Sequence, residues 1–154
     1  MKIRQYSYFS VKSTSLSAAA MAARIEMEPD EVLVMGSRSA EYVLPRVHAW
    51  KIVCRGDQSI EDQIQHLIDR LEPVRAQLTS LCTDEEVTTT MQVVRYFRDA
   101  GGVEAAPHDT GWDRARQYPR PLGWHLSPSA LQFLVSTRAA LDVDEYDMGD
   151  DYDN

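Results

Sequence analysis

Apolar and polar positions alternate along two stretches of the chain, and this pattern predicts two amphipathic strands. In residues 3–12 one set of positions is apolar and the other is aromatic or basic: Ile3, Phe9 and Val11 against Arg4, Tyr6, Tyr8 and Lys12. In residues 87–97 the two sets are Val87, Met91, Val93 and Phe97 against Thr88, Thr90, Gln92 and Tyr96. Because successive side chains of a strand point to opposite faces, each stretch predicts one face on a core and one face partly in water.

Two helices in the first half of the chain are predicted from capping residues and helical spacing. Ser15 or Ser17 precedes a helix whose apolar stripe is Met21 and Ile25, and Pro29 and Asp30 are expected to end it. Ser59, with Asp62 three positions later, resembles a capping box at the start of the second helix. The apolar residues of this second helix recur at offsets of four, three and four: Ile60, Ile64, Leu67 and Leu71.

Prolines delimit the remaining helical segments. Pro73 lacks the amide that a helix interior needs, which predicts a kink or break before a further segment ending near Cys82. Ser127 and Pro128 are a favoured N-cap and first helical residue for a last helix reaching Leu141. Its predicted core stripe is Leu131, Leu134, Val135 and Leu141.

Short strands are predicted over residues 32–35, 47–54, 122–126 and 143–146, the last at a sheet edge. From residue 47 onward the order is then βαββαβ, the split βαβ or ferredoxin-like arrangement. We therefore expect an α+β fold with a mixed or antiparallel sheet and helices on one face. An extra N-terminal strand and helix would precede the ferredoxin-like core. Residues 1–147 would form one domain, and residues 148–154 an acidic tail.

Composition limits the classes of partner. The chain has 154 residues and a formal net charge of -8, so the clustered cations that phosphate contacts need are lacking and no nucleic-acid partner is expected. The longest run without a polar residue, Ala18 to Ala23, is far shorter than the roughly 20 residues of a membrane span. Two cysteines, Cys54 and Cys82, are too few for a secreted disulfide framework. Since no signal peptide is recognisable either, we expect a cytoplasmic protein without membrane contact.

The sequence contains no recognisable motif for catalysis or metal binding. His108, Asp109 and Asp113 of the loop 98–121, with distant His125, are the residues that could gather as metal ligands, but their spacing matches no ligand motif. Neither Gly-x-Ser-x-Gly nor a cysteine with a motif-placed histidine occurs. The sequence therefore predicts no catalytic residue, no metal site and no cofactor.

Several segments resemble, in the same order, a bacterial domain-of-unknown-function family numbered 4279. They are Tyr8-Phe9-Ser10, Leu16-Ser17, Glu28-Pro29-Asp30 with Gly36, Trp50, residues 63–73, Leu126-Ser127-Pro128 and residues 141–146. The resemblance covers nearly the whole chain. These positions are caps, turns and core positions rather than reactive groups, so the resemblance implies a bacterial α+β domain and no catalytic or ligand residue. The chain departs from the family pattern in the loop around residues 99–121 and in its acidic end.

Two surfaces are candidates for contact with a partner. If the polar sides of the two alternating strands share one sheet face, they form an aromatic and polar platform of Tyr6, Tyr8, Thr88, Thr90, Gln92 and Tyr96. The alternative is that a further element or ordinary solvent covers this face. The second candidate is Phe133, which lies opposite the predicted core stripe and would pack beneath the long loop or meet a partner.

We therefore expect a non-enzymatic cytoplasmic domain that binds another protein or itself through the sheet face or the long loop. Its acidity would suit a basic partner. The alternative is a small-molecule-binding domain or an unrecognised enzyme with a pocket under residues 99–121. That pocket would use His108, Trp112, Trp124 and His125.

Overall fold

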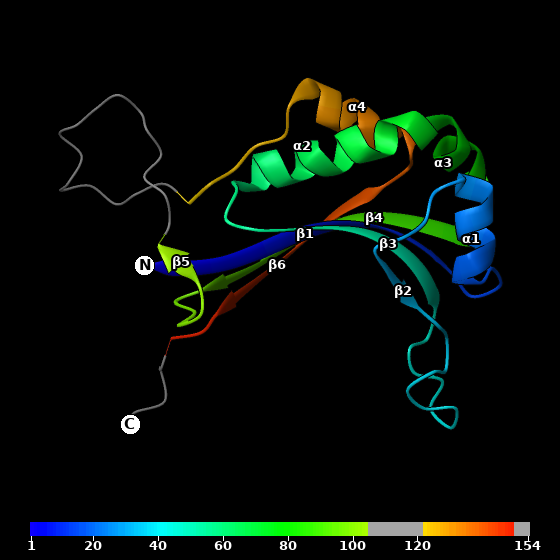
Figure 1. Cartoon of the computed structure of the whole chain (residues 1–154), viewed down its shortest axis with the longest axis horizontal. Helices are drawn as coiled ribbons and strands as arrows, with labels where there is room; N and C mark the ends of the chain where they lie inside the picture. The colour runs from blue at the N-terminus through cyan, green and yellow to red at the C-terminus, as the bar shows by residue number, and fades with distance from the viewer. Residues whose placement is uncertain (105–121, 150–154) are drawn as a thin grey trace.

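One mixed sheet, with helices on a single face, makes up the fold (Figure 1). The structure, a computed structural model, describes residues 1–104 and 122–149. The strands are β1 Lys2–Ser13, β2 Glu31–Leu33, β3 His48–Arg55, β4 Val87–Phe97, β5 Val103–Glu104 and β6 Ala140–Asp147. The helices are α1 Ala18–Ile25, α2 Ile60–Leu71, the 3-10 turn η1 Glu72–Val74, α3 Arg75–Leu81 and α4 Pro128–Ser136. The predicted α+β class, with helices on one face, is confirmed.

The strands lie in the order β2-β3-β1-β4-β6, and β5 pairs with the first residues of β1. All pairs are antiparallel except β4 with β6, which α4 connects as a parallel pair. The ferredoxin-like detail is not confirmed, because β1 lies between β3 and β4. The strand predicted over residues 122–126 is wrong, since residues 122–127 form no strand, and the two-residue β5 was not predicted.

The core lies between the sheet and the helices. Phe9 and Val11 of β1, Trp50 of β3 and Met91 of β4 point into it and are fully buried. The apolar residues predicted for α2 lie on the helix side of the same core, and all four of them are buried. The indole N–H of Trp50 donates to the Met27 carbonyl at 3.0 Å, which satisfies the polar atom of a fully buried ring.

The predicted helix starts are confirmed. The hydroxyls of Ser17, Ser59 and Ser127 each accept a hydrogen bond at 3.1 Å from the backbone amide three residues later. Each therefore satisfies an amide that the helix itself leaves without a partner. At Pro73 the helix tightens into η1 and then continues as α3, as the missing proline amide predicts.

The orientation predicted for the last helix is wrong. Phe133 is fully buried and meets the Phe9 ring edge-on at 5.8 Å, so it is a core residue and not an interaction residue. Leu131 is instead 50% exposed and Val135 is 78% exposed. The helix ends at Ser136, and Leu141, which was assigned to its stripe, lies in β6. The true buried stripe has helical spacing without Leu141: Ala130, Phe133, Leu134 and Thr137.

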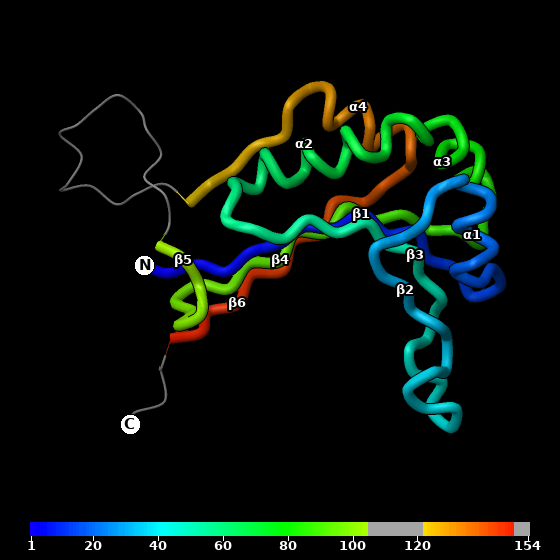
Figure 2. The backbone as a smooth tube through the Cα atoms, in the orientation of Figure 1, coloured from blue at the N-terminus to red at the C-terminus, as the bar shows by residue number. Residues whose placement is uncertain are grey.

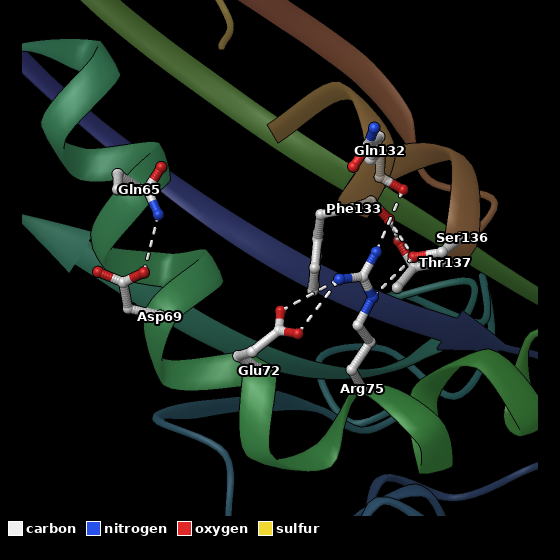
Figure 3. A network of polar contacts seen from close by, with 8 residues as sticks. All are labelled: Gln65, Asp69, Glu72, Arg75, Gln132, Phe133, Ser136 and Thr137. Carbon is white, nitrogen blue, oxygen red and sulfur yellow. Dashed lines mark hydrogen bonds and ion pairs between the residues drawn. The ribbon is translucent and has the colours of Figure 1, made fainter. Parts of the chain in front are cut away.

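Arg75 of α3 connects α4 to the preceding helical segments, with Phe133 of α4 facing the core (Figure 3). Its guanidinium donates to the Ser136 hydroxyl at 3.1 Å and to the Glu72 carboxylate at 3.2 Å, and it lies 5.5 Å from the centre of the Phe133 ring. The Thr137 hydroxyl donates to the Phe133 carbonyl at 2.9 Å, and the Thr89 hydroxyl of β4 donates to the Thr137 carbonyl at 2.7 Å. These bonds fix the end of α4 on the sheet.

Residues 34–47, here called the arm, connect β2 to β3 and project to the side of the sheet opposite the helices (Figure 2). Ser39 and Leu44 pair across its tip. Tyr42, Val43 and Leu44 are exposed there, and Val43 has a φ of 49°. A β-branched residue rarely adopts this left-handed conformation, so the tip is locally strained.

Candidate functional site: the open face of the sheet

The sheet face that the helices leave uncovered, here called the open face, carries the even-numbered residues of β1, β4 and β6 and the odd-numbered residues of β3. The strand register arranges them in rows that run across the sheet. One row is Arg55, Tyr6, Val94 and Asp144; the next is Val53, Tyr8, Gln92 and Asp142. Lys51, Ser10, Thr90 and Ala140 form the row on one side, and Arg4, Tyr96 and Tyr146 the row on the other.

Four tyrosines form two stacked pairs on this face. The rings of Tyr6 and Tyr8 lie 6.3 Å apart at an interplanar angle of 19°. Those of Tyr96 and Tyr146 lie 5.1 Å apart at 18°. Burial, followed by the neighbouring Tyr96 hydroxyl, raises the pKa of Tyr6. All four rings are thus in contact with a neighbouring tyrosine ring.

Three cations lie over these rings. The guanidinium of Arg4 is 4.0 Å from the centre of the Tyr96 ring, the ammonium of Lys51 is 4.6 Å from that of Tyr8, and the guanidinium of Arg55 is 5.5 Å from that of Tyr6. Such contacts restrict both the cation and the ring. Burial against Tyr8 and its neighbours lowers the pKa of Lys51.

Small and polar residues form a floor beneath the rings. Ser10 and Val94 are buried between their larger neighbours, and Gln92 is buried while its amide donates to the Asp144 carboxylate at 3.1 Å. The Ser10 hydroxyl has no hydrogen-bond partner among the described residues. These contacts restrict the side chains of the open face.

Charge divides the open face into two halves. β1 and β3 contribute Arg4, Lys12, Lys51 and Arg55, and β6 contributes Asp142 and Asp144. Glu31 of β2, at the outer edge of the basic half, pairs with Arg55. The acidic half reaches the centre of the face, since burial and then Asp144 and Asp142 raise the pKa of Tyr8.

The structure brings together five of the six residues predicted for interaction. Tyr6, Tyr8, Thr90, Gln92 and Tyr96 lie on the open face, and Phe133 does not. Sequence reasoning missed Tyr146, Lys51 and Arg55, and it placed Arg4 on the side of Tyr6 and Tyr8 without predicting its contact with a ring. The signal for Tyr146 was its place at an even position in the predicted strand 143–146, but only the pairing with β4 puts that position beside Tyr96.

A pocket of about 880 Å³ opens at the end of the sheet where β1 begins, and Arg4, Tyr6 and Arg55 of the open face are among the residues that line it. Trp124 and His125 line it, and the ring of His125 lies 3.3 Å from the Glu61 carboxylate. The two other residues predicted for a pocket, His108 and Trp112, lie outside the described residues. Arg95 also lines it; its buried guanidinium pairs with Glu145 at 2.9 Å, and its Nε has no partner among the described residues.

Within residues 1–104 and 122–149, no three His, Cys, Asp or Glu side chains gather as a metal site would need. His108, Asp109 and Asp113 lie outside this part of the chain. No helix in the same ranges is both long enough and apolar enough to cross a membrane.

Comparison with family models decides the family. The model described as "Domain of unknown function (DUF4279)" matches residues 2–148. The chain belongs to the DUF4279 family. No curated protein and no solved structure matches it.

The segments that resemble DUF4279 have structural roles here. Asp30 and Arg70, from two of these segments, form an ion pair at 2.8 Å, and Trp50 is fully buried. Gln63 is buried too, and its amide donates to the carbonyls of Gly56 and Gln58 at 3.3 Å each. Two of the four stacked tyrosines, Tyr8 and Tyr146, also lie in these segments, so the family pattern includes part of the open face as well as the scaffold.

Proposed function

We propose that this DUF4279 chain is a non-enzymatic, cytoplasmic interaction domain that binds a protein partner through its open face. One observation carries the proposal: two stacked tyrosine pairs share one face with three cations over their rings. Tyrosine and arginine are enriched in protein interfaces, because they supply large contact areas with few rotatable bonds and directional polar groups.

Other functions of an aromatic face have less support. Stacking on nucleic-acid bases would use exposed rings, but the net charge of -8 opposes a polyanion. The three cations nearest the rings are engaged with them rather than arranged to follow a phosphate backbone. A protein surface with its own charged and apolar groups fits the mixture of aromatic, basic and acidic side chains better.

Affinity capture with two matched variants tests this proposal. Tagged wild-type protein is compared with a Tyr8→Ala, Tyr96→Ala variant and with a Gln65→Ala, His66→Ala variant, which changes exposed residues of α2 on the opposite side of the molecule. We expect a stoichiometric protein that the wild type and the α2 variant retain and the tyrosine variant loses. Equal capture by all three folded proteins would sink the proposal.

A second candidate function is the binding of a small anionic molecule in the pocket at the start of β1. The observation that favours it is the unpartnered Nε of buried Arg95 in a pocket that Trp124 also lines. A guanidinium next to an aromatic wall suits a planar carboxylate. Thermal shift with a panel of aromatic carboxylates tests it: a rise in Tm for wild type that Trp124→Ala abolishes would support this function. The absence of any rise would contradict it.

A further inference from the structure

The two charged halves of the open face are complementary to each other. The basic half lies on β1 and β3, with Lys51 and Arg55 at its outer side, and the acidic half lies on β6, with Asp142 and Asp144. From this arrangement we infer that the partner of the open face is a second copy of this chain, packed face to face about a two-fold axis parallel to the strands. This inference rests on the proposed function and names its partner.

The direction of the axis follows from charge. A two-fold axis across the strands would place β3 over β3 and β6 over β6, and like charges would face each other. An axis along the strands, between β1 and β4, places β3 of one copy over β6 of the other. Each basic half then covers an acidic half, and the same contacts occur twice, as in any two-fold interface. Like charges in a contact cost affinity, so only the second arrangement is favourable.

The strand register aligns individual side chains in this packing. Arg55 and Asp144 lie in one row, on the two outer strands of the four that the axis exchanges. Arg55 of one copy therefore lies over Asp144 of the second copy. Lys51 and Asp142 lie one row apart, so the ammonium of Lys51 in one copy can also attract the carboxylate of Asp142 in the second copy. Glu31 accepts from one nitrogen of Arg55 at 2.7 Å, and the guanidinium keeps other donors for a carboxylate above it.

The inner strands contribute the aromatic contacts. In the same packing β1 lies over β4 of the second copy, so Arg4 meets Tyr96 and Tyr8 meets Gln92. Arg4 of the same chain already lies 4.0 Å from the centre of the Tyr96 ring, so the two Arg4 guanidinium groups and the two Tyr96 rings come together near the axis. In the rows of Lys51, Arg55, Asp142 and Asp144, this packing places no two of these four side chains with like charge directly opposite each other.

The area of the open face limits the affinity of the proposed dimer. Four strands spaced by about 4.8 Å and four alternate positions spaced by about 6.7 Å cover roughly 500 Å² per copy. The total, roughly 1,000 Å², is near the lower limit of specific interfaces. We therefore expect a weak dimer that forms with increasing concentration.

Sedimentation velocity of the full chain, from about 5 to about 500 μM, tests the inference. We expect a shift from monomer to dimer. Arg55→Glu and Asp144→Lys should each weaken the dimer by at least about tenfold, since each creates two like-charge contacts. An equimolar mixture of the two variants should recover the dimer, because the mixed pair restores both contacts. Arg24→Glu, an equal charge change on α1 outside the open face, is the matched control and should leave the dimer unchanged.

A monomer over the whole range, or a dimer that neither charge reversal weakens, would overturn the inference. Should a variant unfold, the wild type alone suffices: ring NMR signals of Tyr6, Tyr8 and Tyr96 should shift with concentration, and shifts confined to other residues would also overturn it. The outcome that excludes self-association differs from the outcome that excludes the proposed function. A monomer whose captured protein is lost by Tyr8→Ala, Tyr96→Ala would exclude the second copy as partner while keeping the open face as the binding surface.

Discussion

Asp30 and Arg70 form a two-point ion pair that joins the segment before β2 to α2. The two terminal guanidinium nitrogens of Arg70 each donate to the Asp30 carboxylate at 2.8 Å. The same carboxylate accepts the Val53 amide at 2.7 Å, and the Asp30 amide donates to the Lys51 carbonyl at 2.8 Å. Asp30 thus holds α2, β3 and the start of β2 together. Asp30 and Arg70 belong to two of the segments that resemble DUF4279, so both segments have a structural role.

Removing the charge of Asp30 should destabilise the fold. We expect Asp30→Asn to lower the free energy of unfolding by about 1–2 kcal/mol, because hydrogen bonds to charged groups contribute more than neutral ones but this pair is about one-third exposed. Urea unfolding followed by tryptophan fluorescence measures the change. Asp69→Asn is the control, since Asp69 is exposed and accepts only from Gln65 in the described contacts (Figure 3). Equal losses for both variants would contradict the role of the Asp30–Arg70 pair.

The pH dependence of stability should reveal the same pair. The guanidinium of Arg70 holds the pKa of Asp30 below its ordinary value. A carboxylate whose folded pKa is lowered contributes stability above its unfolded pKa of about 3.9 and loses it as pH falls through the folded pKa. The difference in unfolding free energy between wild type and Asp30→Asn should therefore be constant near neutral pH and shrink below about pH 4. A difference that stays constant down to pH 2 would show that Asp30 acts through shape alone.

The orientation of α4 can be tested by truncating one residue from each of its sides. Phe133→Ala should cost about 3–5 kcal/mol, because it empties a fully buried site against Phe9. Val135→Ala should change stability by less than about 0.5 kcal/mol, because Val135 is exposed. Phe133→Leu, a milder change, keeps the comparison measurable if Phe133→Ala does not fold. The reverse ranking would support the stripe predicted from the sequence.

The arm stores local backbone strain at Val43. Because Val43 has a φ of 49°, Val43→Gly should raise the free energy of unfolding by about 1 kcal/mol. Tyr42→Gly is the matched control: Tyr42 has no positive φ, so glycine there brings only its entropic cost and should not stabilise. Thermal unfolding distinguishes the two, and a lower Tm for Val43→Gly would contradict the strain.

Most of the candidate site follows from the alternating pattern of two strands. The even positions of residues 3–12 and 87–97 predict that Tyr6, Tyr8, Thr90, Gln92 and Tyr96 avoid the core, and the structure places them on one face. Their neighbours could not be predicted in the same way. Tyr146 stacks on Tyr96, and Asp144 accepts from Gln92, only because β6 pairs in parallel with β4. These two strands are far apart in the sequence, so their pairing cannot be predicted from neighbouring residues.

The sequence by itself determined what depends on neighbouring residues: the caps at Ser17, Ser59 and Ser127, the break at Pro73 and the two faces of β1 and β4. Local hydrogen bonds and the two-residue period of a strand are enough for these. Only the tertiary structure decided that β1 lies between β3 and β4 and that α4 buries Phe133 rather than Leu131. α4 has apolar residues on several sides, so its periodicity does not select a face, and the choice depends on which side fits against Phe9 and Arg75 once the sheet has formed.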